Sequence, residues 1–395
     1  MYVNIESLDH KGRGITKIDN KITFVTNALA FEDVDIIITK IKKKYNEAKV
    51  SRYNKISKDR IEPLCPYYLL CGGCNIAHMS YQEQLKFKQN KIANIINKYL
   101  DKNIEINDII YSKQYNYRNK LTLQVNNEIG LYKQETNDII NIDKCLISDK
   151  CINDKIKYLN NLDLKKIKQF ILRISDEEIM LIIVGNKDLD ITPIFKYFDN
   201  IVIKDDKYYL KKGNDYILKR INNLYYKISL DSFFQVNYDI MIKLYDYIKK
   251  NCQNSLNVLD LYCGTGSISI YISDVVKKVN GIEINENAIE DANYNKKINK
   301  VENINFICSD TKDIKLNEYY DTIIVDPPRS GLNKSIIKEI LKVKPQKIIY
   351  VSCDPMTLTR DLKDLKNVYD IDSITPFDMF PNTYHVECVT ILNLE

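Results

Sequence analysis

The chain has 395 residues, which is long enough for two or three domains with cores of their own. Its 58 basic and 53 acidic residues leave a net charge of +5, which is too small to indicate a partner by itself. No apolar run approaches the length of a membrane span and no basic start leads into an apolar stretch, so we expect a cytoplasmic protein with no membrane contact. In that compartment ten cysteines indicate free thiols, metal ligands or catalysis rather than disulfides.

Residues 1–58 have the pattern of a small antiparallel β domain. Short alternating segments flank a turn that contains Gly12 and Gly14, and a basic stretch follows over 40–60. That stretch suits either a phosphate backbone or a solvated lysine face. The segment predicts an OB-like β-barrel, a fold that often binds nucleic acid and elsewhere serves only for packing.

Three cysteines stand close together in the next segment, with the spacing Cys-x5-Cys-x2-Cys. They are Cys65, Cys71 and Cys74, and a Gly-Gly pair between the last two lets the backbone wrap tightly. A tetrahedral thiolate site needs a fourth ligand, for which Cys145 and Cys151 are the candidates. Cys145 is preferred because it lies nearer the end of a strand-like segment. Zinc and an iron–sulfur cluster both accept four thiolates, and the spacing does not decide between them.

Residues 59–225 are predicted to form a central α+β domain around this cysteine site. A helix is expected over 78–100 because its apolar residues recur on one face. Further elements are expected as strands over 120–125, 129–132, 170–174 and 179–184 and as helices near 148–161 and 191–198. Arg118 lies in a cluster of tyrosines and basic residues before the first hairpin and is a candidate for contact with RNA phosphates.

Residues 226–395 change to alternating strands and helices, which predicts a doubly wound parallel sheet. The expected strands lie at 257–262, 279–283, 304–307, 322–326, 348–351 and 386–392. The expected helices lie at 267–276, 288–299, 335–341 and 357–365.

A glycine turn and two carboxylates in this region resemble the S-adenosylmethionine site of class I methyltransferases. Gly264 and Gly266 follow the first strand, Glu283 ends the second and Asp310 follows the third. The carboxylates would hold ribose and adenine, and the glycines would allow close approach of the methionine portion. A nicotinamide site would need a third glycine facing the phosphates.

Cys353 follows the strand over 348–351 and stands before Pro355, which stops the strand. An arbitrary cysteine is most often a small core residue. Ligands of open α/β sheets, however, bind just outside such strand ends. One strand earlier, Asp326-Pro-Pro-Arg329 would form a rigid lip around a flipped base.

Several motifs together resemble the RNA uracil-5-methyltransferase family over nearly the whole chain. They are Phe233-Phe-Gln-Val-Asn237, Leu261-Tyr-Cys-Gly-Thr-Gly266, Asp326-Pro-Pro-Arg-Ser-Gly331, Ser352-Cys-Asp-Pro with Leu358-Thr-Arg-Asp361, and His385-Val-Glu387. The N-terminal module is similar to a TRAM domain. It departs from the family's Pro-Gly-Glu turn, which here is Ala30-Phe-Glu32, and Lys300 replaces a common glycine.

The resemblance implies a class I methyltransferase domain of Rossmann-like α/β fold in which Cys353 is the nucleophile and Glu387 the base. Uracil C5 becomes nucleophilic only after a thiolate adds to C6, and a base must then remove the C5 proton. The S-adenosylmethionine contacts implied by the family or expected from the glycine turn are Gln235, Tyr262, Gly264, Gly266, Glu283, Asp310 and Asp326. Candidate RNA contacts are Arg118, Phe233 and Arg329.

The cysteine pattern indicates which RNA class we expect as the substrate. Cys65, Cys71, Cys74 and Cys145 match the four ligands of the [4Fe–4S] cluster in members that modify 23S ribosomal RNA. The tRNA-modifying branch lacks both cluster and TRAM domain, so the resemblance favours 23S rRNA, with tRNA as the alternative. A non-catalytic iron–sulfur RNA-binding protein is a further alternative, against which the intact set of site residues argues. No protein partner is implied, and we expect a monomer.

Overall fold

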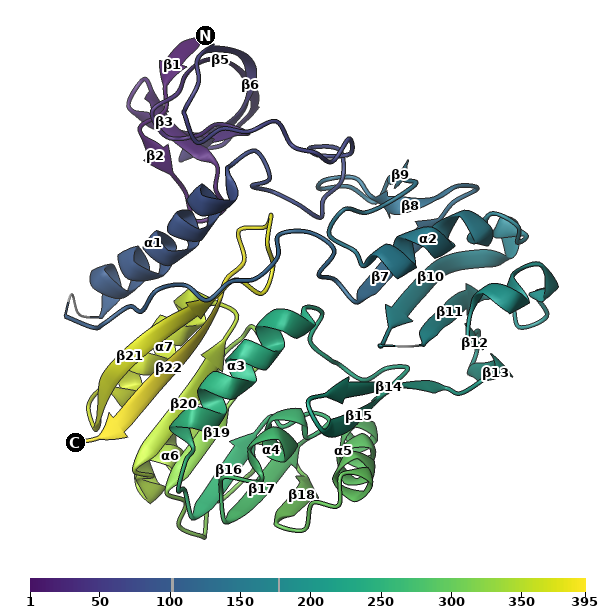
Figure 1. The fold of residues 1–395 in the computed structure, drawn as a ribbon. Helices are drawn as coiled ribbons and strands as arrows, with labels where there is room; N and C mark the ends of the chain where they lie inside the picture. The colour runs from purple at the N-terminus through teal and green to yellow at the C-terminus, as the bar shows by residue number, and fades with distance from the viewer. Residues whose placement is uncertain (101–102, 177) are drawn as a thin grey trace.

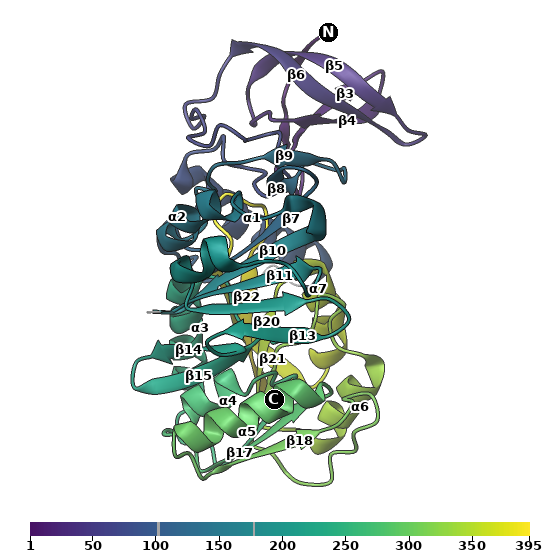
Figure 2. The same cartoon turned by 90° about the vertical axis from the view of Figure 1, so that its right-hand side faces the viewer.

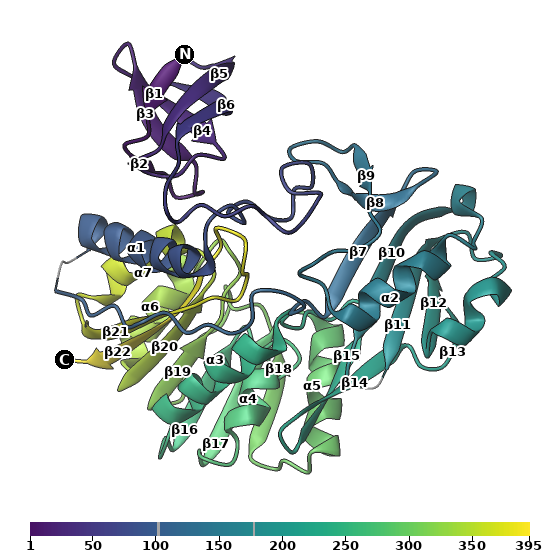
Figure 3. The ribbon, with the colours of Figure 1, turned by 45° about the horizontal axis from the view of Figure 1, so that its top comes forward.

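The computed structural model describes residues 1–100, 103–176 and 178–395, which fold into three parts (Figure 1). The first is a strongly curved six-stranded sheet that stands apart from the rest (Figure 3). Its strands are β1 (Tyr2–Asn4), β2 (Ser7–Leu8), β3 (Gly14–Ile18), β4 (Lys21–Thr26), β5 (Asp33–Ile41) and β6 (Tyr45–Lys55), in the order β1-β5-β6-β4-β3-β2. Val25, Val34 and Ala48 fill its interior. The predicted β domain is confirmed, although β4 and β6 pair in parallel.

A buried ion pair fastens this sheet to the linker that follows it. Arg60 donates to the two carboxylate oxygens of Glu32 at 2.6 and 2.8 Å, and Glu32 is fully buried. The same carboxylate accepts the backbone N–H groups of Leu29 and Ser57. Phe31 precedes this glutamate with a φ of +66° and an exposed ring. The departure from Pro-Gly-Glu therefore keeps the glutamate as an anchor and places an aromatic side chain at a position where φ favours glycine.

The central part is a seven-stranded sheet covered on one face by short helices (Figure 1). Its strands are β7 (Lys120–Val125), β8 (Ile129–Tyr132), β9 (Ile139–Asn141), β10 (Ile167–Ile174), β11 (Ile179–Gly185), β12 (Asn200–Lys204) and β13 (Tyr208–Lys212), in the order β13-β12-β11-β10-β7-β8-β9. The helices are α2 (Lys150–Leu159) and the 3-10 helices η1 (Leu164–Lys166) and η2 (Thr192–Tyr197). All four strands predicted in this part are confirmed, and both predicted helices are present. A hairpin of β14 (Tyr216–Ile221) and β15 (Leu224–Ser229) leads to the last part.

The C-terminal part is a seven-stranded sheet with helices on both faces. Its strands are β16 (Asn257–Leu261), β17 (Lys278–Glu283), β18 (Ile304–Cys308), β19 (Thr322–Val325), β20 (Lys347–Ser352), β21 (Tyr369–Phe377) and β22 (Glu387–Leu394), in the order β18-β17-β16-β19-β20-β22-β21. The helices are α3 (Tyr238–Asn251), α4 (Ser267–Ile272), α5 (Glu286–Ile298), α6 (Lys334–Val343) and α7 (Pro355–Leu365). Alternate residues of one strand serve opposite faces: Val258 packs with α3, α4 and α5, whereas Leu259 packs with α6 and α7.

The prediction of a wholly parallel sheet is wrong at one end. β22 runs antiparallel to both β20 and β21. β21 was not predicted, because Asp370, Asp372 and Pro376 break its apolar pattern. These residues are tolerated since β21 is the outermost strand of the sheet, where a ladder hydrogen bond is not needed on both sides.

Helix α1 (Tyr81–Tyr99) confirms the helix predicted near 78–100, but it packs outside the central part. Its apolar residues Leu85, Ile92 and Ile96 share a core with the C-terminal sheet and with α7. The helical period predicts which face is apolar and does not predict what covers that face. Figure 2 shows the N-terminal sheet at the top, above the central and C-terminal parts, which overlap in this view. In the described ranges, no helix has the length and apolarity that crossing a membrane requires.

Candidate active site

The carboxyl ends of neighbouring parallel strands bring the predicted residues to one edge of the C-terminal sheet. Tyr262 follows β16, Glu283 ends β17, Asp326 follows β19 and Cys353 follows β20. These strands are paired in parallel, so their ends meet at the same edge.

Glu387 reaches this edge because β22 runs in the opposite direction. It is the first residue of β22, and the register pairs its neighbour Cys388 with Ser352, the residue before Cys353. An antiparallel strand begins where the adjacent parallel strands end. The reversal therefore sets a carboxylate beside the cysteine.

Burial keeps both groups protonated more readily than usual. Burial, followed by the carboxylates of Glu387 and Asp326, raises the pKa of Cys353 to about 11. Burial also raises the pKa of Glu387 to about 7, and the charge of Arg329 acts against both shifts. Oε2 of Glu387 is buried and has no hydrogen-bond partner in the described part of the chain. At neutral pH the cysteine is thus a thiol, whereas the carboxyl group is close to its midpoint.

Two further carboxyl groups belong to this region, Asp326 being half-buried and Asp260 fully buried. Burial raises the pKa of Asp326 well above its usual range, and the charges of Glu387 and Asp260 add to the shift. Asp260 lies within β16, accepts a hydrogen bond from Ser269 at 2.5 Å, and has its pKa raised to about 7, chiefly by burial. Sequence reasoning missed Asp260 as a site residue. Its signal was a carboxylate inside an otherwise apolar strand, which is rare without a role.

The turn after β16 forms an open cradle next to Glu283. Gly264 has a φ of +54° and nothing within 4 Å of where a Cβ would lie, whereas a Cβ on Gly266 would lie 2.4 Å from the ring of Phe306. The N–H of Gly264 donates to one oxygen of Glu283 at 3.2 Å. This open backbone beside a carboxylate fits the amino-acid and ribose portions of S-adenosylmethionine. Asp310 lies in the loop after the neighbouring strand β18 and accepts the N–H of Lys312.

Gln235, Arg118 and Phe233 come from segments other than these strand ends. Gln235 is buried in the segment that enters α3, where its backbone oxygen accepts from Asn119 at 2.9 Å. Arg118 and Phe233 line a pocket on the central part, and the Phe233 ring is 74% exposed. Of the three candidate RNA contacts, only Arg329 lies close enough to Cys353 and Glu387 to affect their pKa values.

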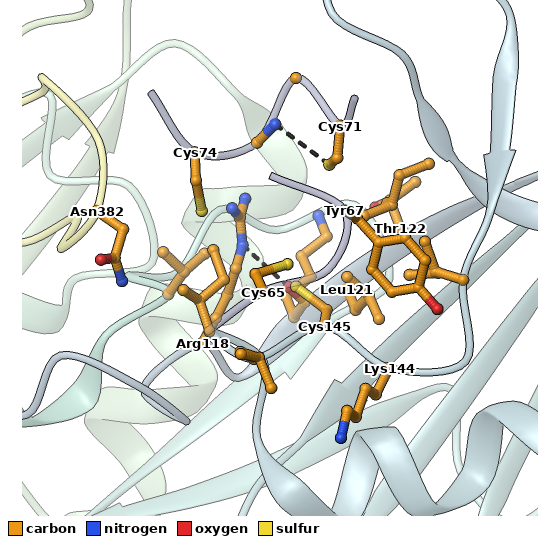
Figure 4. A pocket seen from close by; sticks show the side chains of 18 of the residues that line it. Cys65, Tyr67, Cys71, Cys74, Arg118, Leu121, Thr122, Lys144, Cys145 and Asn382 are labelled. Carbon is orange, nitrogen blue, oxygen red and sulfur yellow. Dashed lines mark hydrogen bonds between the residues drawn. The ribbon is translucent and has the colours of Figure 1, made fainter. Parts of the chain in front are cut away.

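The four predicted cysteine ligands line that same pocket, which has a volume of about 490 Å³ (Figure 4). Cys65, Cys71 and Cys74 come from the loop before α1, and Cys145 comes from the loop between β9 and α2. Cys151 is exposed at the start of α2 and does not line the pocket. The geometry therefore favours Cys145 over Cys151.

Across the described ranges, no three His, Cys, Asp or Glu side chains are grouped so that they could hold a metal ion. Zinc and an iron–sulfur cluster both accept four thiolates.

The pocket opposes the formation of thiolates by the cysteines themselves. Burial raises the pKa of Cys71, Cys74 and Cys145, and neighbouring cysteines add to each shift. Arg118 lowers the pKa of Cys74 and Cys145 but does not cancel the effect of burial. Thiolates gathered in this way require a cationic partner, so the donor set fits a metal centre.

Comparisons with known proteins identify the family of this chain. The family model described as tRNA (Uracil-5-)-methyltransferase matches residues 194–395, and the TRAM domain model matches residues 1–51. An uncharacterized RNA methyltransferase of Staphylococcus aureus strain COL is 33% identical and covers 99% of this chain and 97% of its own length. One of Clostridium tetani is 34% identical and covers 98% of this chain and 95% of its own length.

A solved structure matches the whole chain. It is the Pyrococcus abyssi tRNA (uracil-54, C5)-methyltransferase in complex with S-adenosyl-L-homocysteine, with a TM-score of 0.83 and 28% identity over 99% of both chains. The chain therefore belongs to the RNA uracil-5-methyltransferase family, with a TRAM domain at its N-terminus and an S-adenosylmethionine-dependent methyltransferase fold in its C-terminal region.

Proposed function

We propose that this protein methylates C5 of uridine in RNA through a covalent adduct between Cys353 and C6, with Glu387 as the base. The observation that carries the proposal is the meeting of a half-buried thiol and a buried carboxyl group at one sheet edge. Burial raises the pKa of both groups, and Glu387 also raises the pKa of Cys353. Shifted pKa values of this kind are common in active sites.

The reaction uses the Cys353 thiolate first and the Glu387 carboxylate afterwards. The Cys353 thiolate forms a bond to C6, and the electrons of the C5–C6 double bond move into an enolate that makes C5 nucleophilic. C5 then forms a bond to the methyl carbon of S-adenosylmethionine, which the Gly264 turn and Glu283 would hold, and the sulfur–methyl bond breaks to leave S-adenosylhomocysteine. Glu387 then accepts the C5 proton, the double bond re-forms, and the sulfur–C6 bond breaks to release Cys353 as a thiolate.

Arg329 has a supporting part in this scheme. A thiol with a pKa near 11 is almost entirely protonated at pH 7. Deprotonation of Cys353 in the free protein is therefore unfavourable in free energy. Arg329 is the cation whose charge lowers the pKa of both Cys353 and Glu387. Its exposed position at the lip also suits a contact with the phosphate next to a flipped uridine.

We infer 23S rRNA as the substrate from the cysteine pattern, with tRNA as a second candidate. The Pyrococcus abyssi protein acts on a tRNA uracil and matches 99% of this chain, including the TRAM and cysteine regions. This match supports keeping tRNA as the second candidate. The four cysteines remain the feature that favours 23S rRNA.

We further propose a [4Fe–4S] cluster held by Cys65, Cys71, Cys74 and Cys145. It is supported by the convergence of the four thiols on one pocket. Arg118 and Phe233 line the same pocket, so a cluster would also shape a surface that carries two of the candidate RNA contacts.

Replacement of the nucleophile and of the base should have opposite effects on the adduct. Cys353→Ala should lower methyl transfer by on the order of 10⁴-fold or more, because no other group replaces the thiolate. Glu387→Gln should instead accumulate a denaturant-stable protein–RNA adduct, visible as a slow band on a denaturing gel. Cys151→Ala removes an exposed thiol and serves as the matched control, with activity kept. Full activity of Cys353→Ala would contradict the mechanism.

The resolution of the adduct should depend on pH through Glu387. Only the deprotonated carboxylate can accept the C5 proton, so the single-turnover rate of RNA release should rise with pH and be half-maximal near 7. Arg329→Gln should move this midpoint to higher pH, since the arginine holds the pKa of Glu387 down. Arg220→Gln, at an exposed arginine on β14, should leave it in place. A rate that is flat between pH 5.5 and pH 8.5, roughly the range over which such a group titrates, would exclude Glu387 as the base.

The substrate can be decided by mapping 5-methyluridine in both RNA classes. Cells that lack the gene should lose the modification at one or more positions of 23S rRNA and keep it in tRNA. Purified protein should restore it on unmodified 23S rRNA transcripts. Loss confined to tRNA would show that the second candidate is the substrate.

The metal centre can be tested by composition and colour. Protein purified without oxygen should hold about four iron atoms per chain and show a broad visible absorbance that bleaches on reduction. Cys74→Ser should lose most of this iron, whereas Cys151→Ser should retain it. Colourless protein with one zinc ion per chain would refute the cluster.

A further inference from the structure

The segment 378–386 joins β21 to β22, and Glu387 directly follows it as the first residue of β22. Because Oε2 of that carboxyl group has no hydrogen-bond partner in the described chain, the backbone that delivers the side chain must fix its position. The first pair in the β21–β22 ladder joins Phe377 to Glu387, so the segment is closed at its base. Its far end needs a separate anchor.

Asn382 provides that anchor through both backbone and side chain. Its carbonyl accepts the N–H groups of Asn75 at 3.0 Å and Ile76 at 3.1 Å. Its own N–H donates to Oε1 of Gln84 at 2.9 Å. Its side-chain oxygen accepts from Gln84 at 3.2 Å and from Gln114 at 2.8 Å, and its amide nitrogen donates to the carbonyl of Gln114 at 3.1 Å. One buried residue thus ties three other segments to the loop.

The rest of the loop is held by α1. Lys88 and Asp378 form a fully buried ion pair, and Lys88 also donates to the carbonyl of Phe380 at 2.9 Å. Lys91 donates to the carbonyl of Tyr384 at 2.9 Å. These contacts lie on both sides of Asn382, so the loop is held along its length and Asn382 occupies the middle.

Asn382 also faces the cysteine pocket. It lines that pocket together with the four cysteines, and Figure 4 shows it on the side of Cys74. Asn75, one of its backbone partners, directly follows Cys74 in the chain. The cysteine segment and the loop that carries Glu387 are therefore in direct contact.

We propose that Asn382 is a positioning residue that fixes the Glu387 carboxyl group by fastening the 378–386 loop to α1 and to the cysteine segment. The proposal rests on the proposed role of Glu387 as the base. Its consequence is selective: loosening Asn382 should slow removal of the C5 proton and leave formation of the Cys353–C6 bond in place. A displacement of about 1 Å is enough to slow a proton transfer on the order of 100-fold.

Asn382→Gly tests the proposal without straining the backbone. Asn382 has a φ of +66°, a region that glycine enters freely, so the substitution removes the amide and can keep the turn. Asn127→Gly is the matched control, because Asn127 has a φ of +58° and lies exposed in the β7–β8 turn.

Two measurements on the full-length protein give the outcome. In turnover with RNA, Asn382→Gly should lower kcat by roughly 10- to 100-fold with little change in KM, and should accumulate the adduct as Glu387→Gln does. In hydrogen–deuterium exchange, amides of 378–387 should exchange faster than in Asn127→Gly. Turnover equal to the control, or lost turnover with no adduct while Glu387→Gln still gives one, would overturn the proposal.

The exchange measurement separates this proposal from the proposed function. If Glu387→Gln gives no adduct either, the covalent mechanism fails, and faster exchange confined to 378–387 would still support Asn382 as the anchor of the loop. Unchanged exchange there would overturn the anchor whatever the mechanism.

Discussion

The reversal of one strand is the constraint on which the site depends. β22 lies between β20 and β21 and runs antiparallel to both, so its first residue is at the carboxyl edge of the parallel strands. A strand of eight residues is about 26 Å long. Were β22 parallel, Glu387 would lie that far from Cys353, at the opposite edge of the sheet. The sheet therefore supplies the cysteine from one strand direction and the carboxyl group from the other.

The same edge concentrates carboxyl groups around a thiol in a buried setting. Asp260, Asp326 and Glu387 each have a raised pKa, with burial as the largest cause, and the last two also raise the pKa of Cys353. Without substrate the site therefore favours the protonated, weakly nucleophilic state. A thiolate forms there only when charge is compensated, and Arg329 is the compensating cation in the structure. This arrangement limits reaction of the cysteine with other electrophiles.

Local pattern explains which parts of the fold and site could be predicted. The run Ile348-Ile-Tyr-Val and the cysteine after it indicated a buried strand that ends at a ligand edge, and β20 confirms the strand. The pattern could not predict the direction of β22. A buried strand has the same run of apolar residues whether it pairs in parallel or antiparallel. Helix α3 was missed although its sequence carries helix signals: Asn237 caps its N-terminus, and its buried residues recur with the helical period. Asn382 could not be identified either, because its role consists of contacts with residues about 270 to 300 positions away.

These long-range contacts make the N-terminal half of the chain part of the active site. Before β7 begins, residues 105–110 run beside β21, where Asn107 donates to the carbonyl of Ile374 and Ile110 to that of Pro376, both at 2.9 Å. This segment covers the outer edge of the last strand, and α1 and the cysteine loop hold the turn beyond it. The C-terminal sheet alone would keep the strand that carries Cys353 but would leave β21 as an open edge and the following loop without its anchors. The position of Glu387 is therefore set by residues that precede the methyltransferase region by more than a hundred positions. Through these contacts a shift of the cysteine segment would move Glu387, although the segment does not touch the reacting groups.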